Sequence, residues 1–176
     1  MKKSIIAING SASSNSSNLK LLIKLEELLG KEVEVKIIDD LSILPHFKPE
    51  LSENHTPIEV VELRELIESS DAVLICSPED VFSIPSGLKN CLEWCVSTTI
   101  FAEKPVGLIT ASASGEAAHK EIKLIMKTLG SSFNDDTTLL IQGVKGKLDE
   151  NGAVIDEKTR SELKKFTKDY LESIGF

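Results

Sequence analysis

Small polar side chains are concentrated near the N-terminus, between a β-branched run and an amphipathic run. Residues 10–18 consist almost entirely of glycine, serine and asparagine. Serine hydroxyls donate hydrogen bonds without bulk, and the first N–H groups of a helix have no partner inside it. The helix dipole also favours an anion at that end. The segment therefore predicts a phosphate site, with these candidate contacts: Ser11, Ser13, Ser16, Ser17 and Asn18.

A plainer interpretation is a polar connector in which Ser16 or Ser17 only caps the following helix. One or two residues would serve that purpose, and the segment has many more, so the phosphate interpretation is favoured. Two better-known phosphate motifs are excluded. The dinucleotide-binding fingerprint needs three spaced glycines after the first strand, and Gly10 is the only glycine there. A P-loop needs a Gly-Lys-Ser/Thr sequence before its helix, and this segment has none.

The elements that must position this segment alternate between two periodicities. Strand-like runs are expected at residues 4–9, 33–38, 72–76, 106–110 and 139–142. Helical patterns are expected at residues 18–29, 58–69, 86–96, 117–129 and 158–174. With the Rossmann order excluded, this alternation predicts a flavodoxin-like three-layer α/β/α sandwich whose five-stranded parallel sheet has the order 2-1-3-4-5. Ligands of such sheets bind where the loops after the first, third and fourth strands meet.

Length and composition narrow the function further. The 176 residues suit one domain, and we expect residues 1–176 to form it. A formal net charge of −8 argues against nucleic acid or an anionic membrane as the main partner. The apolar run at residues 5–8 is too short for a signal peptide or a membrane span, so we expect a cytoplasmic protein.

The reactive side chains form no recognisable catalytic or metal-binding pattern. Three cysteines and three scattered histidines have no metal-ligand spacing, so no metal site is expected. Cys91 and Cys95 share a helix face and are interpreted as small buried hydrophobic residues. Without a His/Asp or Cys/His constellation, no catalytic side chain is expected.

A second segment has a specific order of residues. It resembles the flavin-binding segment of the NADPH-dependent FMN reductase family at Pro78, Glu79, Ser83, Pro85, Leu88, Lys89, Asn90 and Trp94. Three further segments are similar to that family's motifs, in the right order: the opening loop at Gly10, Ser11, Ser16 and Asn18, then Leu44-Pro45-His46-Phe47, then residues 110–115.

The resemblance implies an oxidoreductase that binds FMN noncovalently and takes a hydride from NAD(P)H as co-substrate. The acceptor would be a small molecule, namely a flavin, a quinone, an azo compound or a metal oxyanion, and the protein would be a homodimer. The cofactor supplies the hydride chemistry, so no side-chain acid or base is required. The resemblance places further cofactor contacts at Pro78, Glu79, Asp80, Val81, Ser83, Ser112, Ser114 and Gly115.

Two departures from the family pattern bear on this expectation. Ser13 stands where the family has arginine, which removes a charge-assisted bond worth roughly 1.5–3 kcal/mol. Asp80 and Val81 replace a Tyr-Asn pair, and a carboxylate near the flavin opposes its reduction. These departures keep two alternatives open: a flavodoxin-like binding or scaffolding protein without flavin chemistry, and an FMN-binding electron carrier without direct use of nicotinamide.

Other conspicuous side chains have ordinary interpretations. Trp94 is expected in the core or at a dimer interface rather than stacked on the flavin. His119 and His46 are expected to be exposed to solvent. For Lys89 and Asn90, surface exposure and a structural or interface role remain equally plausible.

Overall fold

The sheet has the strand order that the sequence predicts. The computed structural model describes residues 2–176, and its neighbouring strands are all parallel, in the order β2-β1-β3-β4-β5. The strands are β1 (Lys3–Asn9), β2 (Val33–Ile38), β3 (Ala72–Ser77), β4 (Val106–Ser112) and β5 (Thr138–Gln142). The flavodoxin-like sheet is therefore confirmed.

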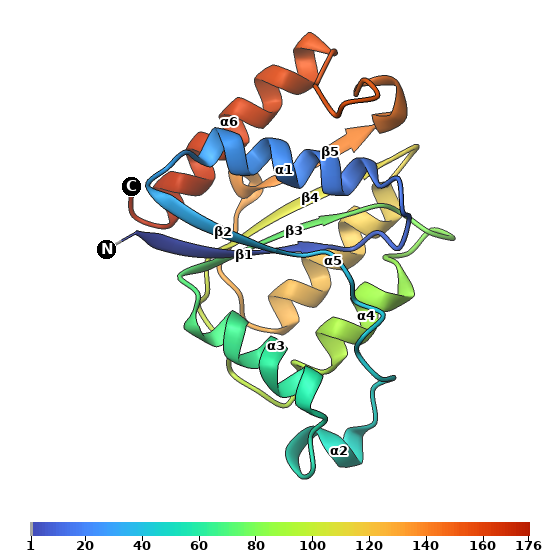
Figure 1. The fold of residues 1–176 in the computed structure, drawn as a ribbon, viewed down its shortest axis with the longest axis vertical. Helices are drawn as coiled ribbons and strands as arrows, with labels where there is room; N and C mark the ends of the chain where they lie inside the picture. Colours follow the sequence, from blue (N-terminus) through green and yellow to red (C-terminus); the bar gives the residue numbers. More distant parts are fainter. Residues whose placement is uncertain (1) are drawn as a thin grey trace.

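Helices cover both faces of the sheet, which gives three layers (Figure 1). One face is covered by α1 (Ser17–Leu29) and α6 (Glu157–Ser173). The other is covered by α3 (Ile58–Ser69), α4 (Ser86–Glu93) and α5 (Glu116–Thr128). Three short segments lie in connections that the sequence patterns did not predict: α2 (Pro49–Glu53) and the 3-10 turns η1 (Asp135–Thr137) and η2 (Val144–Gly146).

Alternate residues of β1 contribute to two separate cores. Ile5 and Ala7 pack with α1 and α6, whereas Ile6 and Ile8 pack with α3, α4 and α5. The central strand β3 is buried along its whole length, as expected for a parallel strand between helical layers. Burying one such aliphatic side chain stabilises the fold by roughly 1.5–3 kcal/mol. The cores thus hold the strands firmly, and polar function is left to the loops at the sheet edge.

Gly107 in β4 leaves room for two aromatic rings of α6. A Cβ atom at this position would lie 2.9 Å from Cζ of Phe166 and 3.2 Å from Cδ2 of Tyr170. The two rings stack with centroids 5.9 Å apart, and both are buried. The two rings therefore form part of the inner face of α6.

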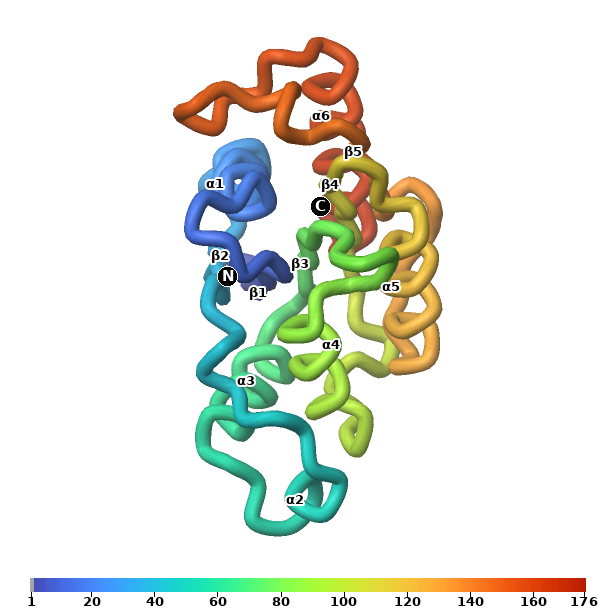
Figure 2. Tube along the Cα trace, turned by 90° about the vertical axis from the view of Figure 1, so that its right-hand side faces the viewer, coloured from blue at the N-terminus to red at the C-terminus, as the bar shows by residue number. Residues whose placement is uncertain are grey.

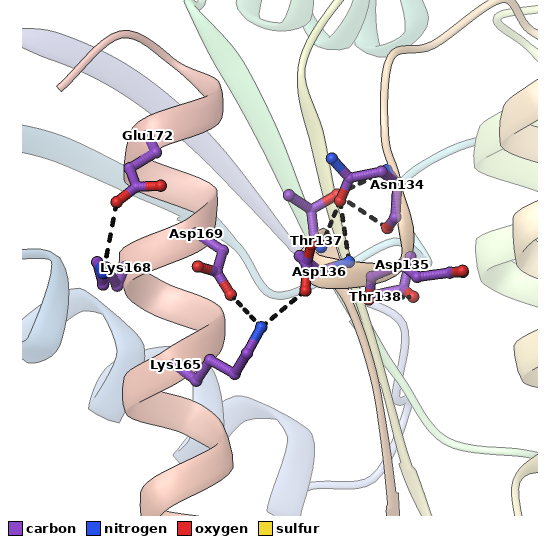
Figure 3. A network of polar contacts seen from close by, with 9 residues as sticks. All are labelled: Asn134, Asp135, Asp136, Thr137, Thr138, Lys165, Lys168, Asp169 and Glu172. Atoms are coloured by element: carbon purple, nitrogen blue, oxygen red, sulfur yellow. Dashed lines mark hydrogen bonds and ion pairs between the residues drawn. The ribbon is translucent and has the colours of Figure 1, made fainter.

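The outer face of α6 carries charged side chains that touch solvent. Lys165 forms ion pairs with Asp169 at 2.6 Å and with Asp136 of η1 at 2.7 Å (Figure 3). These contacts join α6 to the segment that leads into β5. Because all three side chains touch solvent, the pairs add little stability and mainly fix the position of η1.

Trp94 is completely buried and anchors the segment that follows β2. Its Nε1–H donates to the carbonyl of Pro45 at 2.7 Å, and its ring meets that of Phe47 edge-on. Asn90 donates to the same carbonyl and accepts a hydrogen bond from the N–H of Phe47. Trp94 is therefore a core residue, as predicted, and Asn90 has a structural role. His46 is exposed, also as predicted.

The helix α4 ends at Glu93, before the predicted Val96. Arg64 of α3 donates a hydrogen bond from Nε to the carbonyl of Trp94 at 2.9 Å, and a second from Nη2. The next N–H groups then close tight turns onto Leu92 and Glu93 instead of continuing the helix. The predicted end of α4 was wrong because the carbonyl of Trp94 accepts its hydrogen bonds from Arg64 of α3, a helix that is distant along the chain.

All three cysteines are buried and free. Burial raises the pKa of Cys95 to about 12 and that of Cys91 well above its ordinary value. The burial expected of Cys91 and Cys95 is confirmed, and their thiols stay protonated at neutral pH. Within residues 2–176, no helix is long and apolar enough to cross a membrane.

Candidate functional site

The loops after β1, β3 and β4 lie side by side at the carboxyl edge of the sheet, which faces the viewer in Figure 2. Gly10 begins the first of them and donates its N–H to the carbonyl of Cys76 at 2.8 Å. A Cβ atom on Gly10 would lie 2.6 Å from Oγ of Ser77, so only glycine fits this close approach. The first loop is therefore held directly against the end of β3, at the switch point of the sheet.

The serines of the first loop divide into capping and free residues. Ser16 is buried, and its Oγ accepts a hydrogen bond from the N–H of Leu19 at 3.0 Å, so Ser16 is the N-cap of α1. Ser13 is exposed, and Ser17 is partly exposed. Within residues 2–176, the N–H groups of Ser17 and Asn18 make no hydrogen bond. The start of α1 therefore offers unpaired donors, as a phosphate site requires.

Asn18 uses its side chain to fasten α1 to the sheet. Its amide donates to the carbonyl of Ala111 at 3.2 Å and accepts a hydrogen bond from Sγ of Cys76 at 3.3 Å. The side chain is buried. Any contact from Asn18 to a ligand would therefore come from its backbone N–H, while its amide positions the helix end.

Glu79, in the loop after β3, is directed at the start of α5. Its carboxylate accepts hydrogen bonds from the N–H groups of Ala118 at 3.0 Å, Gly115 at 3.2 Å and Ala117 at 2.8 Å. These N–H groups, that of Ala118 foremost, hold the pKa of the Glu79 carboxyl below its ordinary value. A protein carboxylate thus occupies the N-terminus of α5, and the N-terminus of α1 remains available to an exogenous anion.

The same loop contains a strained two-residue turn. Asp80 and Ser83 pair through two backbone hydrogen bonds of 2.9 and 3.0 Å, around Val81 and Phe82. Val81 has φ of 51° and Phe82 has φ of 58°, a left-handed conformation that branched and bulky residues rarely adopt. Both side chains are exposed, at 95% and 81%. The turn brings Asp80 to the cleft and directs apolar groups into solvent.

Glu121 of α5 fixes the far end of this turn. One oxygen of its carboxylate accepts hydrogen bonds from Oγ of Ser83 at 2.7 Å and from the N–H of Ile84 at 2.8 Å. The loop after β3 is therefore attached to α5 at both ends, through Glu79 and through Glu121. Sequence spacing alone did not predict either attachment.

The loop after β4 contributes fewer contacts than the resemblance implied. Ser112 is partly exposed, Ser114 is exposed and Gly115 has φ of 89°. Below it, Nδ1 of His119 lies 2.9 Å from Oγ1 of Thr110. His119 was predicted to be solvent-exposed and is only partly exposed, because it folds back onto buried Thr110. Burial, and then the positive charge of Lys123, lower the pKa of His119.

Two clefts lie on either side of the first loop. The serine cleft, of about 470 Å³, is lined by residues 11–13, 15–18, 78–80, 111–113 and 143–145. The aspartate cleft, of about 570 Å³, is lined by residues 9–14, 39–42, 80 and 85–87. Both volumes are in the range of small-molecule sites. Residues 11–13 and Asp80 are shared, so they form the ridge between the clefts.

The serine cleft collects most of the predicted contacts. It brings together Ser11, Ser13, Ser16, Ser17, Asn18, Pro78, Glu79, Asp80 and Ser112. It leaves four predicted contacts outside its lining: Val81, Ser83, Ser114 and Gly115. Lys145 also lines it and was not predicted, although the rule that sites form at carboxyl strand ends pointed to the residues after β5.

Charge distinguishes the two clefts. The aspartate cleft is lined by Asp39, Asp40 and Asp80, and no lysine, arginine or histidine of residues 2–176 lines it. Asp80 also lines the serine cleft, but there Glu79 is engaged with α5, and Lys145 adds a positive charge. Of the two, the serine cleft is the one suited to an anionic ligand.

Comparison with known proteins identifies the chain. A model of the NADPH-dependent FMN reductase family matches residues 3–143. The chain belongs to this family. Its relatives include the NADPH:quinone oxidoreductase of Arabidopsis thaliana, 29% identical over 91% of this chain and 86% of the relative. The quinone reductase of Escherichia coli is 26% identical over 92% of this chain and 90% of the relative.

A solved structure supports the same conclusion. The flavoenzyme NAD(P)H:(acceptor) oxidoreductase FerB from Paracoccus denitrificans superposes with a TM-score of 0.80 at 26% identity, covering 98% of this chain and 97% of the other. The resemblance seen in the sequence is thereby confirmed as family membership, together with the oxidoreductase class and the flavin cofactor that the family uses.

The residues of the serine cleft fit the phosphate end of FMN. The unpaired N–H groups at the start of α1, the serine hydroxyls and Lys145 are all donors suited to a phosphate. The family's arginine is absent, since Ser13 stands at its position. The loop after β3, which the family places against the flavin ring, keeps its attachment to α5 although Asp80 and Val81 replace the Tyr-Asn pair.

Proposed function

We propose that this family member is an FMN-dependent NAD(P)H oxidoreductase. A hydride would pass from NAD(P)H by way of bound FMN to a small acceptor, namely a flavin, a quinone, an azo compound or a similar molecule. The observation that carries the proposal is the serine cleft, where unpaired donors at the start of α1 adjoin the loops after β3 and β4. Residues 1–176 would act as one FMN-binding domain.

In this proposal the chain binds and orients, and bound FMN supplies the acceptance and donation of hydride. Ser11, Ser13 and Ser17, with the first N–H groups of α1, would hold the phosphate. The fixed backbone around Pro78 and Ser112 would support the ring. The lining of the serine cleft contains no histidine, and no side-chain proton donor is needed for hydride transfer.

The visible absorption spectrum of the purified protein tests the cofactor. We expect bound flavin, or quenching of FMN fluorescence when the apoprotein is titrated with FMN. Failure of FMN to bind or to raise the melting temperature at high micromolar concentration would falsify the flavin assignment. Given binding, consumption of NADH or NADPH with a quinone acceptor separates an enzyme from a flavin-binding protein without reductase activity.

Asp80 is the feature that favours a protein with weakened flavin chemistry. At about 6 Å and an effective dielectric of about 20, a carboxylate opposes formation of an anionic reduced ring by roughly 3 kcal/mol. Asp80 is exposed, so solvent reduces this effect strongly. The variant Asp80→Tyr should raise the reduction potential of bound FMN, whereas an unchanged potential would show that Asp80 does not act on the ring.

We also propose a cytoplasmic homodimer. The apolar side chains of Val81 and Phe82 project into solvent beside the clefts, where a second subunit would cover them. A cytoplasmic location suits an enzyme that takes its hydride from NAD(P)H. Light scattering after size-exclusion chromatography should give twice the 19.2 kDa chain mass. A monomer at micromolar concentration would contradict the dimer and leave the cofactor proposal standing.

A further inference from the structure

The serine cleft has little positive charge to balance a phosphate. A phosphate monoester carries close to two negative charges at neutral pH. The family places an arginine in the first loop, and this chain has Ser13 there. The charged residues that line the cleft are Glu79, Asp80 and Lys145. Helix donors and serine hydroxyls would otherwise face the phosphate without any cation.

Lys145 is held at the cleft by a rigid connection. It lies in η2, shortly after β5, between Val144 and Gly146. The side chain of Val144 is buried. The N–H of Gly143 donates to the carbonyl of Ala113 at 3.1 Å, which joins this connection to the loop after β4. The backbone that carries Lys145 is thus fixed by a core contact and by a backbone hydrogen bond.

The ammonium group of Lys145 has no bonding partner among residues 2–176. The side chain is exposed, and across residues 2–176 it takes part in no ion pair and no hydrogen bond. Lys20, by contrast, donates from Nζ to the carbonyl of Glu150 at 3.2 Å. A free ammonium in a cleft with unpaired helix N–H groups is a donor set that suits phosphate.

We propose that Lys145 supplies the cation that binds the phosphate of the flavin nucleotide in the serine cleft, in place of the arginine missing at position 13. The inference rests on the proposed function and adds a residue from the other end of the chain to the cofactor site. The phosphate would then lie between the start of α1 and η2. Affinity for FMN would depend on salt, because part of it comes from an exposed charge.

Equilibrium titration of the apoprotein with FMN and with riboflavin, which lacks the phosphate, tests this assignment. We expect Lys145→Gln to weaken FMN binding by about tenfold, the size of a charge-assisted contact, and to leave riboflavin binding unchanged. The salt dependence of FMN binding should also decrease. Lys147→Gln is the matched control, since Lys147 is a neighbouring lysine outside the cleft lining, and it should bind FMN like the wild type.

A gain-of-function variant completes the test. Adding Ser13→Arg to Lys145→Gln should restore FMN affinity, because the family's own cation returns to the first loop. Equal FMN affinity in the wild type and Lys145→Gln would overturn the inference, as would a parallel loss of FMN and riboflavin, which indicates a structural effect. These outcomes leave the proposed function intact. If wild-type protein does not bind FMN, the proposed function and the inference both fail.

Discussion

The two loops that border the serine cleft are held in opposite ways. Beyond Gly10, which is bonded to the end of β3, the loop after β1 is joined by short local contacts, such as the N–H of Ser13 donating to Oγ of Ser11 at 3.2 Å. The loop after β3 is attached at both ends to α5, through the carboxylates of Glu79 and Glu121. The first loop thus leaves its hydrogen-bond donors free for a ligand. The second loop is already fixed in the shape that a ligand would contact. Unpaired donors suit a phosphate, and a fixed backbone suits a rigid ring.

The second loop also stores strain that the first does not. Val81 and Phe82 both adopt the left-handed conformation, which costs of order 1–3 kcal/mol for each non-glycine residue. Glu79 and Glu121 keep the loop in this shape. If the comparison is right, removing an attachment should destabilise the protein, and relieving the strain should stabilise it.

The largest effect is expected at Glu79. The variant Glu79→Ala removes the acceptor for three N–H groups of α5 and should lower the free energy of unfolding by about 2 kcal/mol. Because folding lowers the pKa of this carboxyl, its contribution is present above the ordinary value of 4.5 and is lost as the pH falls through the lower folded-state value. Urea unfolding at neutral pH and through this acidic range measures both effects.

Glu116→Ala is the control for that measurement. Glu116 is also a carboxylate in the first turn of α5, but it is exposed and reaches only Nε2 of Gln142, at 3.4 Å. Its loss should change stability by less than about 0.5 kcal/mol. Equal effects of the two variants would show that general charge near the helix, and not the hydrogen bonds of Glu79, is responsible.

A smaller effect of opposite sign is expected in the strained turn. Replacing Val81 by Asn and Phe82 by Gly places residues that accept positive φ and should stabilise the protein by about 1–2 kcal/mol. Thermal unfolding of the double variant measures this. Val96→Asn controls for the loss of an exposed apolar side chain, since Val96 is 63% exposed but has ordinary φ. With both proteins in the same oligomeric state by light scattering, a double variant no more stable than this control would mean that the turn is not strained in solution.

The difference between the loops also explains what the sequence could predict. Strands, helices and layers follow from apolar periodicity, and the strand order follows once the dinucleotide fingerprint is excluded. The apolar run of β3 predicted its central position. The first loop was recognisable because its contacts beyond Gly10 are local, including the Ser16 cap. The direction of Glu79 and the place of Lys145 depend on partners 30 or more residues away along the chain, which local patterns do not encode. The end of α4 was missed for the same reason, since Arg64 reaches it from another helix.

The smallest effect is expected in the first loop. Ser16→Ala removes the buried acceptor for the N–H of Leu19 and should lower the free energy of unfolding by about 1 kcal/mol. Amide exchange at Leu19 should become faster. Ser14→Ala is the control, because Ser14 is an exposed serine of the same loop and should change stability by less than about 0.5 kcal/mol. Similar results for both variants would mean that the first loop gains nothing from its cap. The contrast between the two loops would then rest on Glu79 and Glu121, which anchor the second loop to α5.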